Sequence, residues 1–441
     1  MRRWIPLLAA LALAAGCAGT PVSEESPGAT STPAPTSIAW TDPEVLGDDS
    51  TVPLLAAAVH GPQGMVSQRA SRGVWEEGPT TSLHFSTDGG SWEETFASPG
   101  LEVELASGEA GYVAVGARYR PPAGGDLELA PWAAWSADGQ TWEIAAVTLP
   151  GDSTGDGDGT DPGDDETADA APDGMGGLVV VPATVDPPVV AGTWLSDVVA
   201  TADGFVALGH SQRAGQRNIL LTSADGKAWN PLPEDPFGGE VSVRELVAGA
   251  GSYVAYGYRE TEGDYVGAVV AWRSEDAVTW ELAAAGDGFE DEYGGGPFVG
   301  GLAAFGDGFV MLGWDARQPP AAWVSADGSE WGEPVRLPSI NDMSAEVHAV
   351  AASPHFLVAV GREVVSNEGN APADQYPALW FSSDGVQWSQ VPHEDLRGER
   401  TDDGVSVESV AWTGERWVTL GSAWDYPDEI PTVLAWTGEE L

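Results

Sequence analysis

The chain has 441 residues, and its 18 lysines and arginines face 68 aspartates and glutamates, for a formal net charge of −50 at pH 7. This acidity repels nucleic-acid phosphates and so excludes DNA and RNA as partners, and it favours solubility over capture of a specific cation. The 57 glycines, the 33 prolines and the scarcity of helical periodicity predict an all-β chain with many turns.

The N-terminal segment predicts export. Two arginines precede an apolar run over residues 5–16, which is shorter than the roughly 20 residues that cross a bilayer. Cys17, the only cysteine, follows Ala14-Ala15-Gly16, and this arrangement resembles the lipobox of bacterial lipoproteins. The resemblance implies a signal peptide over 1–16, a lipidated Cys17 and an extracytoplasmic protein held at the bacterial cell membrane by its lipid anchor alone. The alternative is an ordinary secretory signal with a chance cysteine.

Small and polar residues and prolines dominate the stretch after the cysteine, so we expect a lipid-anchored flexible linker over residues 17–37. The folded region then spans residues 38–441.

A seven-residue string recurs six times, as STDGGSW (86–92), SADGQTW (136–142), SADGKAW (223–229), SEDAVTW (274–280), SADGSEW (325–331) and SSDGVQW (382–388). Its glycine can take positive φ, its Ser and Asp side chains can accept hydrogen bonds from turn amides, and its tryptophan can enter the core. We therefore predict structural turn roles for Asp88, Asp138, Asp225, Asp276, Asp327 and Asp384, and for Trp92, Trp142, Trp229, Trp280, Trp331 and Trp388.

A second string reads as a strand with a glycine at its exit: YVAVG (112–116), FVALG (205–209), YVAYG (253–257), FVMLG (309–313), LVAVG (357–361) and WVTLG (417–421). An alternating apolar segment and a tight turn precede most copies. One unit is thus four antiparallel strands, and its period of usually about 50 residues favours a β-propeller.

Counting the units predicts seven blades. The last unit stops at residue 441 before a tryptophan-bearing fourth strand, whereas Ala39-Trp40 resembles the opening of such a strand at Ala228-Trp229. We therefore predict that residues 38–46 complete the seventh blade and close the ring, which hides two sheet edges.

The seven-residue string resembles the Asp-box, or BNR repeat, of sialidase-like β-propellers, whose usual pattern SxDxGxTW has one more residue between Asp and Trp. The resemblance covers the chain from about residue 38 to its end and implies the propeller fold. In that family the boxes lie on outer turns away from the active site, so the resemblance implies structural roles for them and says little about activity.

The variable loops after the second strand of each unit carry nine arginines. Guanidinium groups on such loops suit carboxylated or phosphorylated polymers, sugars or acidic peptide segments. The alternative is that they pair with neighbouring acidic residues. The nine are Arg69, Arg72, Arg118, Arg120, Arg213, Arg217, Arg259, Arg317 and Arg362.

An acidic insertion over residues 150–175 has no apolar pattern and predicts a disordered loop. Its Asp and Gly residues do not meet the pattern of an EF-hand calcium loop, so we assign no metal. The apolar stretch 174–192 that follows has no predicted place in the fold.

These observations favour a monomeric, non-enzymatic propeller that binds a glycan, a cell-wall polymer or a peptide on its loop-rich face. The alternatives are a scaffold for assembling exported proteins and a divergent sialidase-like glycoside hydrolase. The Arg-Ile-Pro signature of sialidases does not occur, nor do a nucleophile elbow, a metal-ligand spacing or a phosphate loop. We therefore assign no catalytic residue and no cofactor.

Overall fold

The computed structural model divides the chain into residues 1–34 and a second unit, residues 35–441, to which all described residues belong. The described ranges are 36–47, 53–54, 58–71, 80–87, 91–120, 128–150, 192–211, 218–238, 241–249, 251–259, 268–285, 289, 298–315, 318–339, 344–365, 374–397, 404–424 and 432–441. The predicted signal peptide, the lipidated cysteine, residues 17–35 of the predicted linker and nearly all of the acidic insertion lie outside them. The last two residues of the predicted linker, Thr36 and Ser37, are described and form backbone hydrogen bonds with Leu441. In the part of the chain that is described, no helix has the length and apolar character needed to cross a membrane.

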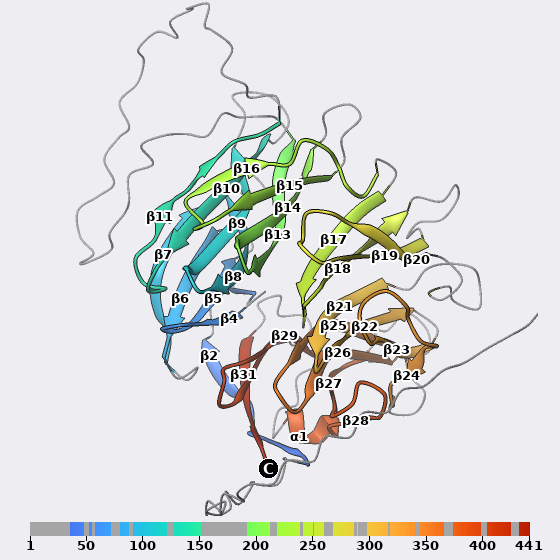
Figure 1. Ribbon diagram of the computed structural model, residues 1–441. Coiled ribbons are helices and arrows are strands. Elements are labelled where there is room, and N and C mark those ends of the chain that lie inside the picture. Colours follow the sequence, from blue (N-terminus) through green and yellow to red (C-terminus); the bar gives the residue numbers. More distant parts are fainter. Residues whose placement is uncertain are drawn as a thin grey trace, which may run out of the picture. The chain divides into compact units, whose positions relative to one another are not determined.

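The described chain is almost entirely β, as predicted, and its strands form six sheets (Figure 1). The first two sheets contain β3 (Pro53–Leu54), β4 (Ala58–Gly61), β5 (Gly64–Ser71), β6 (Thr80–Ser86) and β7 (Glu93–Pro99), then β8 (Leu101–Gly108), β9 (Gly111–Arg120), β10 (Glu128–Ser136) and β11 (Glu143–Ile144). The third contains β13 (Thr193–Thr201), β14 (Gly204–Ser211), β15 (Asn218–Ser223) and β16 (Ala228–Pro231), with β12 (Ala146–Val147) parallel to β16.

The fourth sheet contains β17 (Val241–Ala248), β18 (Tyr253–Arg259), β19 (Ala268–Ser274) and β20 (Glu281–Ala285), and the fifth contains β21 (Phe298–Phe305), β22 (Gly308–Asp315), β23 (Gln318–Ser325) and β24 (Val335–Arg336). The sixth has nine strands: β25 (Ser344–Ala352), β26 (Leu357–Val365), β27 (Asp374–Ser382), β28 (Trp388–Gln390), β29 (Gly404–Trp412), β30 (Trp417–Trp424), β31 (Thr432–Glu440), β1 (Ile38–Trp40) and β2 (Glu44–Gly47). One short helix, α1 (His393–Arg397), follows β28.

Successive sheets meet through seven strands that we call the inner strands. The first five sheets supply one each, β4, β8, β13, β17 and β21, and the nine-stranded sheet supplies two, β25 and β29. Each inner strand contacts the next, and the series closes because β29 contacts β4. Figure 1 shows them along the facing sides of their sheets. Side chains of the inner strands therefore meet residues that lie far away in the sequence.

Residues 38–46 pair with the last unit, as the sequence predicts. β1 runs antiparallel to β31, with Ile38 opposite Glu440, and β2 pairs with an earlier part of β31. Ile38 is buried in a cluster with Trp417 and Trp436. The two ends of the folded unit are therefore joined by backbone hydrogen bonds and by shared apolar burial.

The recurring glycines lie inside their strands, so the prediction that they end the strands is wrong. Gly361 lies opposite Val347, and β26 continues to Val365. The inner strand β25 has a register shift just after Val347, so it carries one extra residue there. The extra residue of β25 is His348. The same shift lies opposite the corresponding glycine in four other strand pairs, where the bulged residues are Ser196, Arg244, Gly300 and Glu408.

The aspartates of the repeated string accept hydrogen bonds inside their own turns. Asp138 Oδ1 accepts from the amides of Gln140 at 2.8 Å and Thr141 at 2.7 Å, while Ser136 Oγ accepts from the Gly139 amide at 2.9 Å. Although partial burial opposes ionisation, these amide hydrogen bonds hold the pKa of Asp138 below its ordinary value. Asp225, Asp276, Asp327 and Asp384 accept from turn amides in the same way, and Asp88 lies outside the described residues.

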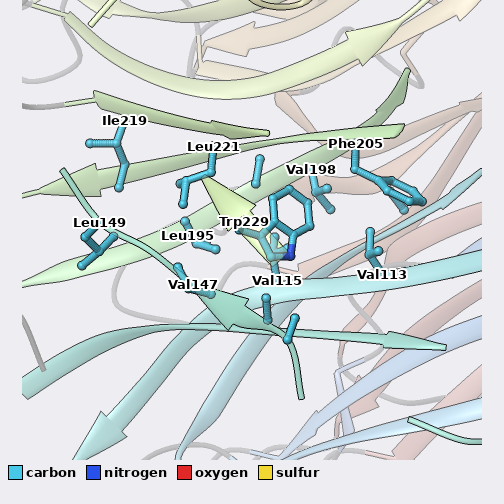
Figure 2. Packing of buried hydrophobic residues seen from close by; sticks show 14 residues of the cluster. Val113, Val115, Val147, Leu149, Leu195, Val198, Phe205, Ile219, Leu221 and Trp229 are labelled. Atoms are coloured by element: carbon cyan, nitrogen blue, oxygen red, sulfur yellow. The ribbon is translucent and has the colours of Figure 1, made fainter. Parts of the chain in front are cut away.

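The tryptophans that end the strings pack between sheets. Trp229 is 1% exposed and lies in one cluster with Val113 and Val115 of the second sheet and with Leu195 and Leu221 of the third (Figure 2). Burial of an indole removes about 150–250 Å² from water and contributes an upper bound of about 4–6 kcal/mol. Trp142 and Trp280 are also buried, whereas Trp92, Trp331 and Trp388 are partly buried.

Candidate functional site

The structure describes the side chains of three of the nine predicted arginines. Arg362 on β26 is held by Glu346, whose Oε2 lies 2.6 Å from Nη2 and 2.8 Å from Nε, and its Nη1 donates to Gln375 at 2.9 Å. Arg118 on β9 and Arg259 on β18 are partly buried. The side chains of Arg69 and Arg120, and the whole of Arg72, Arg213, Arg217 and Arg317, lie outside the described residues. For Arg362 the local ion pair that the sequence left as the alternative is therefore present.

Glu346, His348, Arg362 and Glu408 form what we call the ion-pair network. His348 is the bulged residue of β25; its Nδ1 lies 3.0 Å from Glu408 Oε2 and its Nε2 lies 3.4 Å from Glu346 Oε2. Its Nδ1 also lies 3.1 Å from the carbonyl oxygen of Val407 on β29. The imidazole thus bridges two inner strands.

The charges of this network support one another. Burial disfavours the charged imidazole, but the hydrogen bonds with Glu346 and Glu408 outweigh it and raise the pKa of His348 to about 9. His348 lowers the pKa of Glu346 in return, and it does the same for Glu408 against the opposing effect of burial. At neutral pH the network therefore contains two cations, His348 and Arg362, and two carboxylates. The Arg362 guanidinium binds Glu346 and Gln375 of the same chain.

A second group, which we call the carboxyl cluster, comprises Glu104 on β8, Asp197 on β13 and Glu245 on β17. Asp197 Oδ1 accepts from the Val198 amide at 2.7 Å, and its Oδ2 accepts from the Leu246 amide of the next inner strand at 2.5 Å. Glu245 likewise accepts from the Leu302 amide of β21. Each of these two carboxyl groups therefore satisfies a backbone donor on the inner strand of the following sheet.

The carboxyl cluster resists ionisation. Burial, followed by the negative charges of Asp197 and Glu102, raises the pKa of Glu104 to about 8. Burial raises the pKa of Asp197 to about 7 even though two amides donate to it. Burial, Asp197 and Glu104 together raise the pKa of Glu245 well above its ordinary value. Protons are therefore retained here under conditions in which exposed carboxyl groups have lost them.

A third group, which we call the aromatic patch, comprises Arg244, Tyr258, Phe298 and Trp314. The rings of Phe298 and Trp314 stack with centroids 4.8 Å apart and planes inclined by 25°, and Phe298 is 44% exposed. Tyr258 Oη accepts from the Val299 amide at 2.7 Å, which ties the fourth sheet to the fifth. The guanidinium of Arg244, a bulged and exposed residue, lies 5.9 Å from the centre of the Tyr258 ring.

Sequence reasoning missed most of these residues. A usable signal was an acidic residue inside an alternating apolar segment: Glu104, Asp197 and Glu245 each stand twelve positions before the recurring glycine of their unit. Arg244, Phe298 and His348 carry no such signal, because their placement depends on the bulges and on the neighbouring sheet. In the described ranges, no three His, Cys, Asp or Glu side chains are placed to share a metal ion.

No family model matches the chain, and no curated protein matches it. Among solved structures, the chain is similar to YCF48 bound to D1 peptide, with 14% identity, a TM-score of 0.45 and coverage of 90% of this chain and 96% of that one. It is similar to the β-propeller domain of the Trilobed protease from Pyrococcus furiosus, with 9% identity, a TM-score of 0.45 and coverage of 87% and 93%. A Trypanosoma rangeli sialidase in complex with the inhibitor DANA matches at 12% identity and a TM-score of 0.38, over 77% of this chain and 54% of that one.

Proposed function

We propose that the chain is a monomeric seven-bladed β-propeller, lipid-anchored through Cys17 outside the bacterial cell membrane. It binds a ligand on its aromatic patch and does not catalyse a reaction of that ligand. The lipobox-like residues before Cys17 support the anchor, and the strands and their contacts support the propeller. The observation that supports the binding function most is the exposed, stacked Phe298–Trp314 pair.

Strand pairing supports the blade count. The nine-stranded sheet divides into β25 to β28 and a second group of β29 to β31 with β1 and β2, and a single parallel bridge between Gln375 and Gly404 joins them. With that division every sheet has one inner strand, and the inner strands form a closed series. Pairing of β1 with β31 joins the chain ends, which removes two sheet edges.

The aromatic patch has the composition of a recognition surface. Phe298 leaves nearly half of its surface exposed although its other face is covered by Trp314. Large rigid rings beside an arginine dominate the binding energy of many interfaces. Arg244 is exposed, and among the described residues no carboxylate lies within ion-pair distance of it. Its guanidinium group suits a hydroxyl or carboxylate group of a ligand.

The patch therefore suits a ligand with a ring or apolar side chain next to hydroxyl or carboxylate groups. A carbohydrate and a peptide segment both have this chemistry, and the two are distinguished by experiment. The full chain with Cys17→Ser, which removes the proposed lipid, is applied to an array of neutral and uronic-acid oligosaccharides and to an array of immobilised peptides.

Phe298→Ala is expected to weaken binding at least about fivefold, because stacking contributes about 1 kcal/mol or more per aromatic contact. Arg244→Ala should weaken binding most for carboxylate-bearing probes. Leu282→Ala is the matched control, since Leu282 is an exposed apolar residue on β20 outside the patch. Equal loss in the Leu282 variant, or undiminished binding by both patch variants, would refute the proposed surface.

A further inference from the structure

The carboxyl cluster occupies the same position on three consecutive inner strands. Glu104, Asp197 and Glu245 stand in β8, β13 and β17, and these strands contact one another in that order. All three side chains are partly buried in the fold. Edge strands present unpaired backbone groups, and here two of those groups find their partner in a carboxyl oxygen.

The cluster connects sheets as well as strands. The Asp197 carboxyl accepts the Leu246 amide of the fourth sheet, and the Glu245 carboxyl accepts the Leu302 amide of the fifth. These hydrogen bonds run from one inner strand to the next, and among the described strands no β-ladder joins the sheets there. The contacts between the third, fourth and fifth sheets therefore depend in part on the positions of the Asp197 and Glu245 carboxyl groups.

Among the described residues, few charges near the cluster can compensate for ionisation. Arg244 on β17 acts on Tyr256 and Tyr258 of β18, and both tyrosines keep their protons because burial raises their pKa values. On β8 the second acid, Glu102, accepts a hydrogen bond from Tyr119 of β9 at 2.8 Å and adds a repulsive charge. The residues of β21 have no titratable side chain, and the His60 ring of β4 lies against Gly414.

We propose that Glu104, Asp197 and Glu245 form a proton-dependent joint that holds β8, β13 and β17 together when it is protonated and loosens when protons are released to the solvent. Each release leaves one carboxylate on the protein, so up to three like charges face one another. Arg244 of the aromatic patch directly precedes Glu245 on β17, so loosening of β17 also displaces Arg244. The proposed joint does not depend on whether the aromatic patch binds a ligand.

The direction of the effect follows from proton linkage. Unfolded Asp and Glu lose their protons near pH 4, whereas the folded cluster keeps them to higher pH because burial raises the pKa of Asp197 to about 7 and that of Glu104 to about 8. The folded state then binds more protons than the unfolded state across this interval. The stabilisation is complete below about pH 4 and is lost as the pH rises through 7 and 8.

Hydrogen exchange of the full chain tests the joint. Exchange is followed by mass spectrometry at pH 5 and pH 8.5, with rates corrected for the intrinsic pH dependence of amide exchange. We expect protection of residues 241–248 in β17 to fall about tenfold or more at the higher pH, since one pKa unit corresponds to a factor of ten. Glu104→Gln/Asp197→Asn/Glu245→Gln should keep equal protection at both pH values.

Glu143→Gln, which removes an exposed carboxyl on β11, is the matched control and should behave as the wild type. If the triple variant does not fold, Glu104→Gln alone decides the question, because among the described residues Glu104 accepts no backbone hydrogen bond. A wild type with pH-independent protection of β17 overturns the proposal, and so does a Gln variant with an undiminished pH effect.

Discussion

The α-carbon of Gly361 lies so close to the carbonyl of Glu346 that an ideal Cβ on the glycine would be 1.9 Å from that oxygen. Gly361→Ala is therefore expected to destabilise the fold by about 3 kcal/mol, the upper part of the usual range for overpacking, because two backbones must separate beside the ion-pair network. Chemical denaturation measures the change.

Gly332→Ala is the control for that substitution. A Cβ at Gly332 would lie 3.4 Å from the Val324 carbonyl oxygen, which is ordinary contact. We expect a change of no more than about 0.5 kcal/mol in the free energy of unfolding. Similar losses at both positions would contradict the close approach at Gly361.

Asp138→Ala removes the acceptor of two turn amides and should cost about 1–2 kcal/mol, because the amides of Gln140 and Thr141 lose their partner. Asp203→Ala, in an exposed turn with no hydrogen bond to its side chain among the described residues, should cost no more than about 0.5 kcal/mol. Thermal unfolding of the two variants compares them directly. Equal melting temperatures would show that the Asp138 hydrogen bonds contribute nothing to stability.

His348 is expected to stay protonated at pH 8, because Glu346 and Glu408 raise its pKa to about 9. Its contribution to stability is then complete below about pH 6.5 and is lost as the pH rises through 9. Proton NMR of the histidine ring hydrogens should show one of the six histidines titrating near pH 9. Glu408→Gln should move that midpoint toward neutral pH, and an unmoved midpoint would mean that Glu408 does not hold the charge.

Deletion of residues 38–47 should lower the melting temperature and broaden the transition, because β31 then loses the pairing with β1 and β2 and exposes the cluster that contains Ile38. Deletion of residues 20–30, which precede the unit 35–441, is the control and should leave the transition unchanged. A sharp, unshifted transition after the first deletion would show that the N-terminal strands do not stabilise the unit.

Cys17→Ser should release the protein from the membrane fraction and abolish incorporation of labelled fatty acid, since the proposed anchor is covalent and no other residue can take the lipid at a thioether. Fractionation with labelled palmitate measures both effects. Ser23→Ala, in the proposed linker, is the control and should stay membrane-bound and labelled. Persistent labelling of the Cys17 variant would refute the proposed lipid anchor at Cys17.

The sequence by itself determined the four-strand unit, the turns and the pairing of residues 38–46 with β31. Each depends on chemistry within a short stretch: Asp138 reaches the amides of Gln140 and Thr141, and the alternation of apolar residues marks which side of a strand is buried. Such interactions recur wherever the string recurs, so the repeats allow them to be predicted from the sequence.

Only the tertiary structure decided which side chains meet on the inner strands. Asp197 and Leu246 are 49 residues apart, and His348 and Val407 are 59 residues apart. A bulge in β25 or β17 changes which way His348 or Arg244 points, and alternation in the sequence does not reveal a bulge. Of the nine predicted arginines, Arg362 forms an ion pair with Glu346, and Arg244, which the sequence analysis did not single out, lies over the Tyr258 ring. The partners of both depend on how neighbouring strands pack, which the sequence does not show.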